Sequence, residues 1–127
     1  MIYGIGTDIA EIARVEKVYA KHGLHFIENL LTPEEVKILE ARNGKGEFIA
    51  GRWAAKEAFA KALGTGIGKD CSFADIEILP DENCRPVIAN LYGQAAITVK
   101  NRGISRIHVS ISHEKEYAVA FVVMEAD

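Results

Sequence analysis

The sequence is poor in the residues that mark disulfide-rich and metal-ribbon proteins. It contains two cysteines, Cys71 and Cys84, and three prolines among 127 residues. Two cysteines are too few for a disulfide scaffold, and they lack the paired spacing of a zinc ribbon. We therefore expect both thiols to be free.

Long apolar runs are also absent. No segment approaches the roughly 20 consecutive apolar residues that a membrane helix needs, and the N-terminal Met1–Gly4 lacks the charged start of a secretory signal. We expect a cytoplasmic protein that does not bind membranes. The chain has 127 residues, of which 49% are hydrophobic and 26% charged, which is ordinary for one folded domain. The expected domain spans residues 1–127.

Positive charge is slightly outnumbered by negative charge overall, with 15 Lys or Arg against 18 Asp or Glu, but it is concentrated in one segment. The net charge is −3, which gives no general attraction for nucleic acid. Segment 43–69 nevertheless carries five Lys or Arg against two acidic residues, whereas 1–42 carries five against seven and 70–127 five against nine. Such a basic island suits a compact anion such as phosphate better than a long duplex. We therefore expect no nucleic-acid partner.

Start and stop signals divide the first half of the chain. The short apolar segment Ile2–Gly6 predicts a strand, and Asp8 with Glu11 matches the cap and third position of a helix. The sequence Thr32-Pro33-Glu34-Glu35 is a second helix start. Gly64 stands where a C-cap glycine belongs. These signals predict helices over about 9–21, from Pro33 to near Asn43-Gly44, and over Glu47–Leu63.

The second half alternates strands with one helix. Apolar alternation and turn residues predict strands over 75–79 and 87–91, a helix over 93–102, and a hairpin of strands over 107–111 and 117–124. Helices and strands thus mix without the regular alternation of parallel units. This favours an α+β fold in which an antiparallel sheet packs against helices.

The helix over 47–63 is apolar on all sides, which predicts burial, yet beyond its first residue it carries four charges, at Arg52, Lys56, Glu57 and Lys61. Glu57 and Lys61 are four residues apart, and for this pair alone a simple surface ion pair is the favoured interpretation. Together with Arg52 and Lys56, and with the glycine-rich Gly64–Gly68 that follows, they instead favour a site for phosphate and a metal ion. A plain helix cap explains the glycines equally well. The run does not match a Walker A loop.

Asp8 has two interpretations. Its spacing to Glu11 favours a helix cap. A carboxylate at the end of a strand also projects into many functional sites, and Mg²⁺ usually takes one or two protein carboxylates beside phosphate oxygens. Asp8 and Glu57 are therefore candidate magnesium ligands.

Two further groups of polar residues have simple structural explanations. Arg14, Lys17 and Lys21 form a stripe on the first helix, which is either a solvated face or a docking surface for an acidic partner. Ser112 and His113 lie in no nucleophile elbow, so we exclude a serine hydrolase. Taken alone, His113 is a turn residue.

Three segments together resemble a known family. They are Gly4-Ile5-Gly6-Thr7-Asp8-Ile9, Phe48-Ile49-Ala50-Gly51-Arg52-Trp53-Ala54-Ala55-Lys56-Glu57-Ala58 followed by Lys61, and His108-Val109-Ser110-Ile111-Ser112-His113. In this combination the chain resembles the short phosphopantetheinyl transferases of the holo-[acyl-carrier-protein] synthase type. The likeness covers essentially the whole chain.

The resemblance implies an enzyme that moves 4′-phosphopantetheine from coenzyme A to a serine of apo acyl carrier protein, releasing adenosine 3′,5′-bisphosphate. It implies Mg²⁺ as cofactor, with Mn²⁺ left open, and a homotrimer with sites between subunits. Fatty acid biosynthesis is the expected pathway, and polyketide synthesis stays open. The serine proton could pass to Glu57, directly or through water, or to a hydroxide on the metal.

The resemblance also assigns roles to residues. It implies that Asp8 and Glu57 hold the metal and that Lys61 lies beside the pyrophosphate, so that these three form the catalytic set. Coenzyme A would be bound by Arg52 and His113 near its 3′-phosphate and by Lys61, Gly64, Thr65 and Gly66 along its phosphates, and the acidic carrier protein by Arg14, Lys17 and Lys21.

One position departs from the family pattern, since Cys84 follows Asn83 where the family commonly has glycine. This leaves the type of that turn open. Two other functions also stay open: a regulatory trimer that binds coenzyme A or a nucleotide without chemistry, and a structural domain whose helix charges pair internally.

Overall fold

The chain folds into a long three-stranded sheet, a short two-stranded sheet and five α-helices, described over residues 1–127 by a computed structural model. Both sheets are antiparallel. The elements in order are β1 (Ile2–Glu11), α1 (Ile12–His22), α2 (Leu24–Leu30), α3 (Pro33–Glu40), α4 (Lys45–Leu63), a 3₁₀ turn (Phe73–Asp75), β2 (Ile76–Pro80), β3 (Pro86–Leu91), α5 (Gly93–Asn101), β4 (Ile104–His113) and β5 (Tyr117–Ala126).

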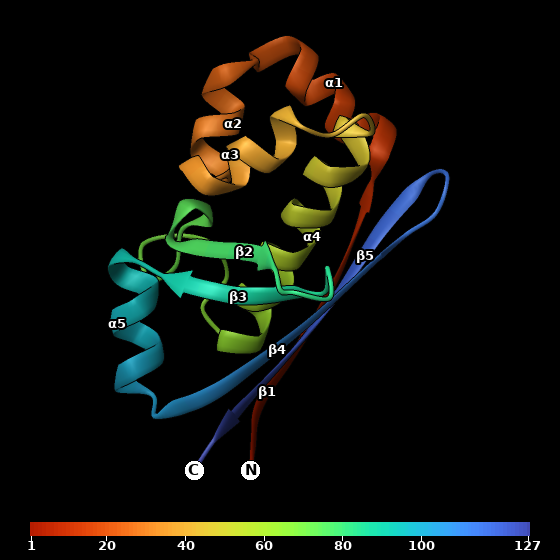
Figure 1. The fold of residues 1–127 in the computed structure, drawn as a ribbon. Coiled ribbons are helices and arrows are strands. Elements are labelled where there is room, and N and C mark those ends of the chain that lie inside the picture. Colours follow the sequence, from red (N-terminus) through yellow and green to blue (C-terminus); the bar gives the residue numbers. More distant parts are fainter.

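The long sheet has the order β1-β5-β4, so the first strand of the chain pairs with the last. In its register Gly6 lies opposite Val122, and Val122 lies opposite Val109. The two chain ends meet, since the Ala126 nitrogen donates to the Met1 carbonyl oxygen at 2.8 Å. All the helices lie on one side of this sheet (Figure 1). The predicted α+β class, with an antiparallel sheet packed against helices, is confirmed.

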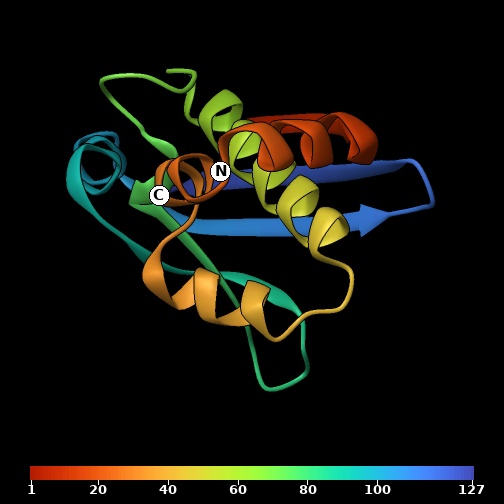
Figure 2. The same ribbon diagram turned by 90° about the horizontal axis from the view of Figure 1, so that it is seen from above.

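Helix α4 is the centre of the packing. It crosses the long strands in the view from above (Figure 2), and both of its flanks are buried in apolar clusters. Phe59 and Leu63 pack with Ile76 and Val122 on the side of the sheets. Ile49 packs in a second cluster with residues of α1, α2 and α3. Full burial of such a side chain contributes about 1.5–3 kcal/mol, so these clusters fix the helix on the sheet.

Two glycines bring β1 and α4 into backbone contact. A Cβ atom added to Gly4 would lie 3.0 Å from the Ala62 carbonyl carbon, and one on Gly6 would lie 2.7 Å from the Ala62 nitrogen. Both would overlap a helix carbonyl oxygen. Only glycine allows this approach, and it brings the following residues of β1 beside Trp53 and Glu57 of α4.

The N-terminal helix begins later than the sequence predicts. Strand β1 continues through Asp8, which lies opposite Ala120, to Glu11 opposite Tyr117. Helix α1 starts at Ile12, and its cap residue Glu11 makes no side-chain cap bond. The prediction that Asp8 caps the helix is therefore wrong, because pairing with β5 overrides the local cap signal. The helix ends at His22 before Gly23, as expected, but α2 was not predicted.

Other local sequence signals agree better with the observed helix ends and turns. Thr32 accepts from the Glu35 nitrogen and forms the predicted capping box, and Gly64 ends α4 with φ 89°. Helix α3 stops at Glu40, earlier than predicted, because residues 41–44 form the connection to α4. The hairpin of β2 and β3 is present, and Cys84 adopts φ 64° in its turn. That angle is in the left-handed region that favours glycine.

The face of the long sheet that points away from the helices is uncovered, and it is largely apolar on β1 and β5 but polar on β4, where Ser110 and Ser112 lie opposite Phe121 and Val119. Its outward side chains are 40% to 61% exposed on β1 and β5, namely Ile5, Ile9, Tyr117, Val119 and Phe121. Contiguous apolar surface of this kind marks an interaction site. None of the helices has the length and apolar character required to cross a bilayer.

Candidate active site

Strand β1 delivers Asp8 to helix α4. Alternate residues of a strand share a face, so Asp8 lies on the same face as Gly4 and Gly6, the two glycines that contact the helix. Continuing along this face, Asp8 meets the helix at Lys61, one turn after Glu57. The glycines therefore set how close the carboxylate comes to the helix.

Lys61 spans the gap between strand and helix. Its Nζ donates to Asp8 Oδ1 at 2.9 Å and to the Thr7 carbonyl oxygen at 3.0 Å. The Asp8 and Lys61 side chains are 21% and 51% exposed, so the pair stabilises the fold by no more than about 1 kcal/mol. Glu57 forms no ion pair with Lys61. The simple interpretation of these two residues as a surface pair is wrong.

Asp8 and Glu57 line one pocket at this corner of the molecule. Its wall also includes Glu11, Arg14 and Trp53 from β1, α1 and α4. No cluster of three or more His, Cys, Asp or Glu side chains is placed to hold a metal. Two carboxylates that line one pocket are nevertheless the protein share that Mg²⁺ usually takes, with phosphate oxygens and water completing its shell. The donor set therefore fits Mg²⁺.

Only one end of the cationic stripe on α1 reaches this pocket. Arg14 lines it, whereas Lys17 and Lys21 lie on exposed surface farther along the helix. The structure therefore places one end of the predicted docking surface beside Asp8 and Glu57.

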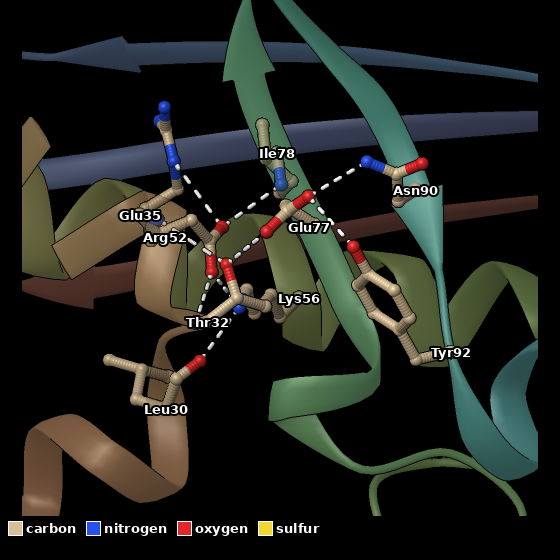
Figure 3. Close-up of polar contacts among 9 residues, drawn as sticks. All are labelled: Leu30, Thr32, Glu35, Arg52, Lys56, Glu77, Ile78, Asn90 and Tyr92. Atoms are coloured by element: carbon tan, nitrogen blue, oxygen red, sulfur yellow. Dashed lines mark hydrogen bonds and ion pairs between the residues drawn. The ribbon is translucent and has the colours of Figure 1, made fainter. Parts of the chain in front are cut away.

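Lys56 does not belong to the phosphate-metal site that the sequence favours. It is fully buried, and its Nζ donates to Glu35 Oε1 at 2.6 Å and to the Leu30 carbonyl oxygen at 2.7 Å (Figure 3). Burial lowers the pKa of Lys56, while the charge of Glu35 opposes that shift. Its charge is thus balanced inside the protein, and the inclusion of Lys56 among the anion-binding cations is wrong.

Arg52 and His113 do come together, in a second pocket. This pocket is also lined by Arg42, Glu47 and Phe48. The Arg52 guanidinium lies 4.5 Å above the Phe48 ring centroid and that of Arg42 lies 5.3 Å from it. His113 Nδ1 is 3.4 Å from Glu47 Oε2.

The second pocket is basic and partly desolvated. Burial lowers the pKa of Arg52 to about 10, against the opposing charge of Glu35. Arg42 was missed by the sequence analysis, since nothing in the sequence places a residue of the α3–α4 connection beside His113. The pocket shares no lining residue with that of Asp8 and Glu57.

The glycine loop follows the last turn of α4 and lines neither pocket. Gly64 and Gly66 have φ of 89° and 66°, and Thr65 Oγ1 donates to the Gly66 carbonyl oxygen at 2.8 Å. Arg102 Nη1 donates to the Leu63 carbonyl oxygen at 2.7 Å, which caps the helix beside this loop. The role of Arg102 was also missed, because a long-range cap leaves no local sequence signal.

Comparison with known proteins identifies the class. Residues 4–122 match the model of the 4′-phosphopantetheinyl transferase superfamily. The chain is 46% identical over 125 residues to a holo-[acyl-carrier-protein] synthase of Dechloromonas aromatica and 48% identical over 127 residues to one of a Geobacillus species, with 98% of each chain covered. The chain therefore belongs to this superfamily, and within it to the holo-[acyl-carrier-protein] synthase family.

Solved structures agree in fold. A holo-(acyl-carrier-protein) synthase from Bacillus anthracis in complex with CoA (3′,5′-ADP) has a TM-score of 0.83 and 43% identity, covering 100% of this chain and 99% of that one. The synthase from Neisseria meningitidis has a TM-score of 0.90 and 42% identity, with 98% and 99% covered. The Helicobacter pylori synthase in complex with coenzyme A has a TM-score of 0.84 and 37% identity, with 95% and 99% covered.

Proposed function

We propose that the chain transfers the 4′-phosphopantetheine arm of coenzyme A to a serine of apo acyl carrier protein in fatty acid biosynthesis. The observation that carries the proposal is the meeting of Asp8, Glu57 and Lys61 at one corner, built by the glycine contacts between β1 and α4. Membership of the holo-[acyl-carrier-protein] synthase family and its solved coenzyme A complexes support it.

The reaction exchanges one phosphorus–oxygen bond for another. The serine oxygen of the carrier bonds to the phosphorus that bears pantetheine, the bond from that phosphorus to the nucleotide oxygen breaks, and adenosine 3′,5′-bisphosphate leaves. The serine proton passes to a base. Glu57 lines the pocket, so it is placed to take this proton directly or through a water. Lys61 is placed to neutralise charge on the phosphate under attack, which lowers the barrier electrostatically.

Asp8 and Glu57 are the residues that would hold Mg²⁺. When bound there, the ion would supply Lewis-acid polarisation of the pyrophosphate oxygens. The contribution of the chain is to hold the two carboxylates at fixed separation on a strand and a helix, so that little reorganisation is needed at the moment of reaction.

The second pocket suits the 3′-phosphate of coenzyme A. Arg42, Arg52 and His113 converge there, and arginine is well suited to a phosphate monoester. Gly64, Thr65 and Gly66 would border the remaining phosphates through their backbone N–H groups.

A homotrimer would explain two features together. The apolar outer face of the long sheet needs a cover, and the two pockets are separate within one chain. In a trimer with sites between subunits, the Asp8 pocket of one chain would complete the Arg52 pocket of its neighbour. The exposed Arg14, Lys17 and Lys21 would receive the acidic carrier protein. Sedimentation at equilibrium should give three chain masses.

The decisive experiment is a carrier-modification assay. The protein is incubated with coenzyme A, Mg²⁺ and apo acyl carrier protein, and intact mass spectrometry should find one phosphopantetheine arm added to the carrier serine. Asp8→Asn and Glu57→Gln should each abolish the added mass while circular dichroism remains native. Binding of coenzyme A without any mass added to a panel of carriers would instead indicate a regulatory nucleotide-binding trimer.

A further inference from the structure

A buried carboxylate on α3, Glu35, pairs unequally with two buried cations on α4. Arg52 and Lys56 lie one turn apart on α4, and both face the carboxylate of Glu35, which is fully buried. A buried carboxylate requires a countercharge, and so does each buried cation. Glu77 also acts on Lys56 from β2, but Glu35 is the only carboxylate paired with both cations, and the distances show which of the two it holds more closely.

The two oxygens of Glu35 have different partners. Oε1 accepts from Lys56 Nζ at 2.6 Å and from the Thr32 nitrogen at 2.9 Å. Oε2 accepts from the Ile78 nitrogen at 2.9 Å, and Arg52 Nε stays 3.8 Å away from it. The short ion pair is thus with Lys56, because attraction between charges weakens with distance.

Arg52 forms a long ion pair with Glu35 but no hydrogen bond to it. Its side chain is only 9% exposed, and yet its buried Nε has no hydrogen-bond partner. The two terminal nitrogens of Arg52 point away from the carboxylate (Figure 3). Arg52 also lines the pocket with Arg42 and His113, so its charge remains available on that side.

We propose that Lys56 is a positioning residue for anion binding: by taking the charge of Glu35, it keeps Arg52 free to bind a phosphate monoester. This inference rests on the proposed function, in which that monoester is the 3′-phosphate of coenzyme A. It gives a role to a buried lysine that touches neither pocket.

Removal of Lys56 should make Arg52 the only cation left for Glu35. The Arg52 Nε needs to move by less than 1 Å from its 3.8 Å separation to form a hydrogen bond with Oε2. A charge-assisted bond of this kind would hold the guanidinium inside the protein. The loss should then be confined to ligands that carry the 3′-phosphate.

The test compares equilibrium binding of coenzyme A with that of 3′-dephospho-coenzyme A, by calorimetry with the assembled protein. The measured quantity is the ratio of the two dissociation constants. With the ratio written as the dissociation constant of 3′-dephospho-coenzyme A divided by that of coenzyme A, Lys56→Met should lower it about tenfold relative to wild type, while the dissociation constant of the dephospho form stays unchanged. In the double variant Lys56→Met/Glu35→Gln the ratio should return toward wild type, because the carboxylate that captured Arg52 is gone.

Two controls separate this role from simple stabilisation. Glu77→Gln removes the neighbouring buried carboxylate, which bonds to Thr32, Asn90 and Tyr92, and should keep the wild-type ratio. Lys56→Gln, which keeps a hydrogen-bond donor near Leu30, serves if Lys56→Met does not fold. Equal weakening of both ligands, or no recovery in the double variant, contradicts the inference.

Arg52→Ala distinguishes failure of the inference from failure of the proposed function. If Arg52→Ala keeps the wild-type ratio, Arg52 does not bind the 3′-phosphate, and both the role of Lys56 and the assignment of the second pocket are overturned, whereas transfer itself fails only if the carrier gains no mass. If Arg52→Ala loses the preference for coenzyme A but Lys56→Met keeps it, only the role of Lys56 is overturned.

Discussion

Replacing Gly6 with alanine should separate strand β1 from helix α4. The new Cβ would lie 2.7 Å from the Ala62 nitrogen and would overlap the Ala58 carbonyl oxygen. Favourable contacts begin near 3.5 Å, and the Ala58 carbonyl oxygen is the nearer obstacle, so the strand must move by more than about 1 Å. Neither obstacle is a flexible side chain that could turn away.

The cost follows from the buried contact. Overpacking of a core by one methyl group typically costs about 1–3 kcal/mol, and a backbone obstacle places Gly6→Ala near the upper end of that range. Alanine also restricts the unfolded chain, which returns about 0.4–1 kcal/mol. We therefore expect a net loss of about 2 kcal/mol, a large part of the 5–15 kcal/mol that stabilises a typical domain.

Urea unfolding followed by the fluorescence of Trp53 measures this loss. Trp53 is the only tryptophan of the chain and packs against Phe26 and Phe73. Protein concentration must be equal in all samples, because association would shift apparent stability. Gly68→Ala is the matched control, since a Cβ there meets nothing within 4 Å. A Gly6→Ala protein as stable as Gly68→Ala would refute the close-contact account.

Three further predictions concern single groups. Burial acts to raise the pKa of Glu77, but hydrogen bonds from Thr32, Asn90 and Tyr92 outweigh it and hold that pKa below its usual value. The stabilisation from ionised Glu77 is therefore complete above about pH 4.5 and is lost as the pH falls below it. In Glu77→Gln the free energy of unfolding, measured with urea, should depend less on pH in that acidic range. Cys71 is fully buried, and burial raises the pKa of its thiol to about 12, so a thiol reagent should modify only Cys84 until urea unfolds the chain; rapid modification of both native thiols would contradict this. Cys84→Gly should raise the free energy of unfolding by up to about 1 kcal/mol, because φ 64° favours glycine; an unchanged or lower value would show that the turn is not strained.

Local sequence signals predicted most of the elements but not the start of α1. Thr32 and Gly64 act through neighbours a few residues away, and both behave as predicted. Asp8 has an equally good local cap signal, yet it lies in a strand that pairs with residues more than 100 positions later. Long-range pairing of this kind leaves little trace in the local pattern.

The orientation of charges on α4 could not be predicted for a related reason. The helix is apolar on every side, so helical periodicity assigns no face to Arg52, Lys56 or Lys61. In the structure Lys56 points inward and pairs with Glu35, Lys61 pairs with Asp8 on β1, and Arg52 lines the second pocket. These partners lie on other elements, and only the packing brings them together.

The central claim is that Asp8 and Glu57 hold one divalent ion between strand β1 and helix α4. Titration of the protein with Mn²⁺, followed by electron paramagnetic resonance in the presence of coenzyme A, counts bound ions directly. We expect one ion per chain in the wild type and at least tenfold weaker binding in both Asp8→Asn and Glu57→Gln. Wild-type Mn²⁺ affinity in either variant would contradict the claim.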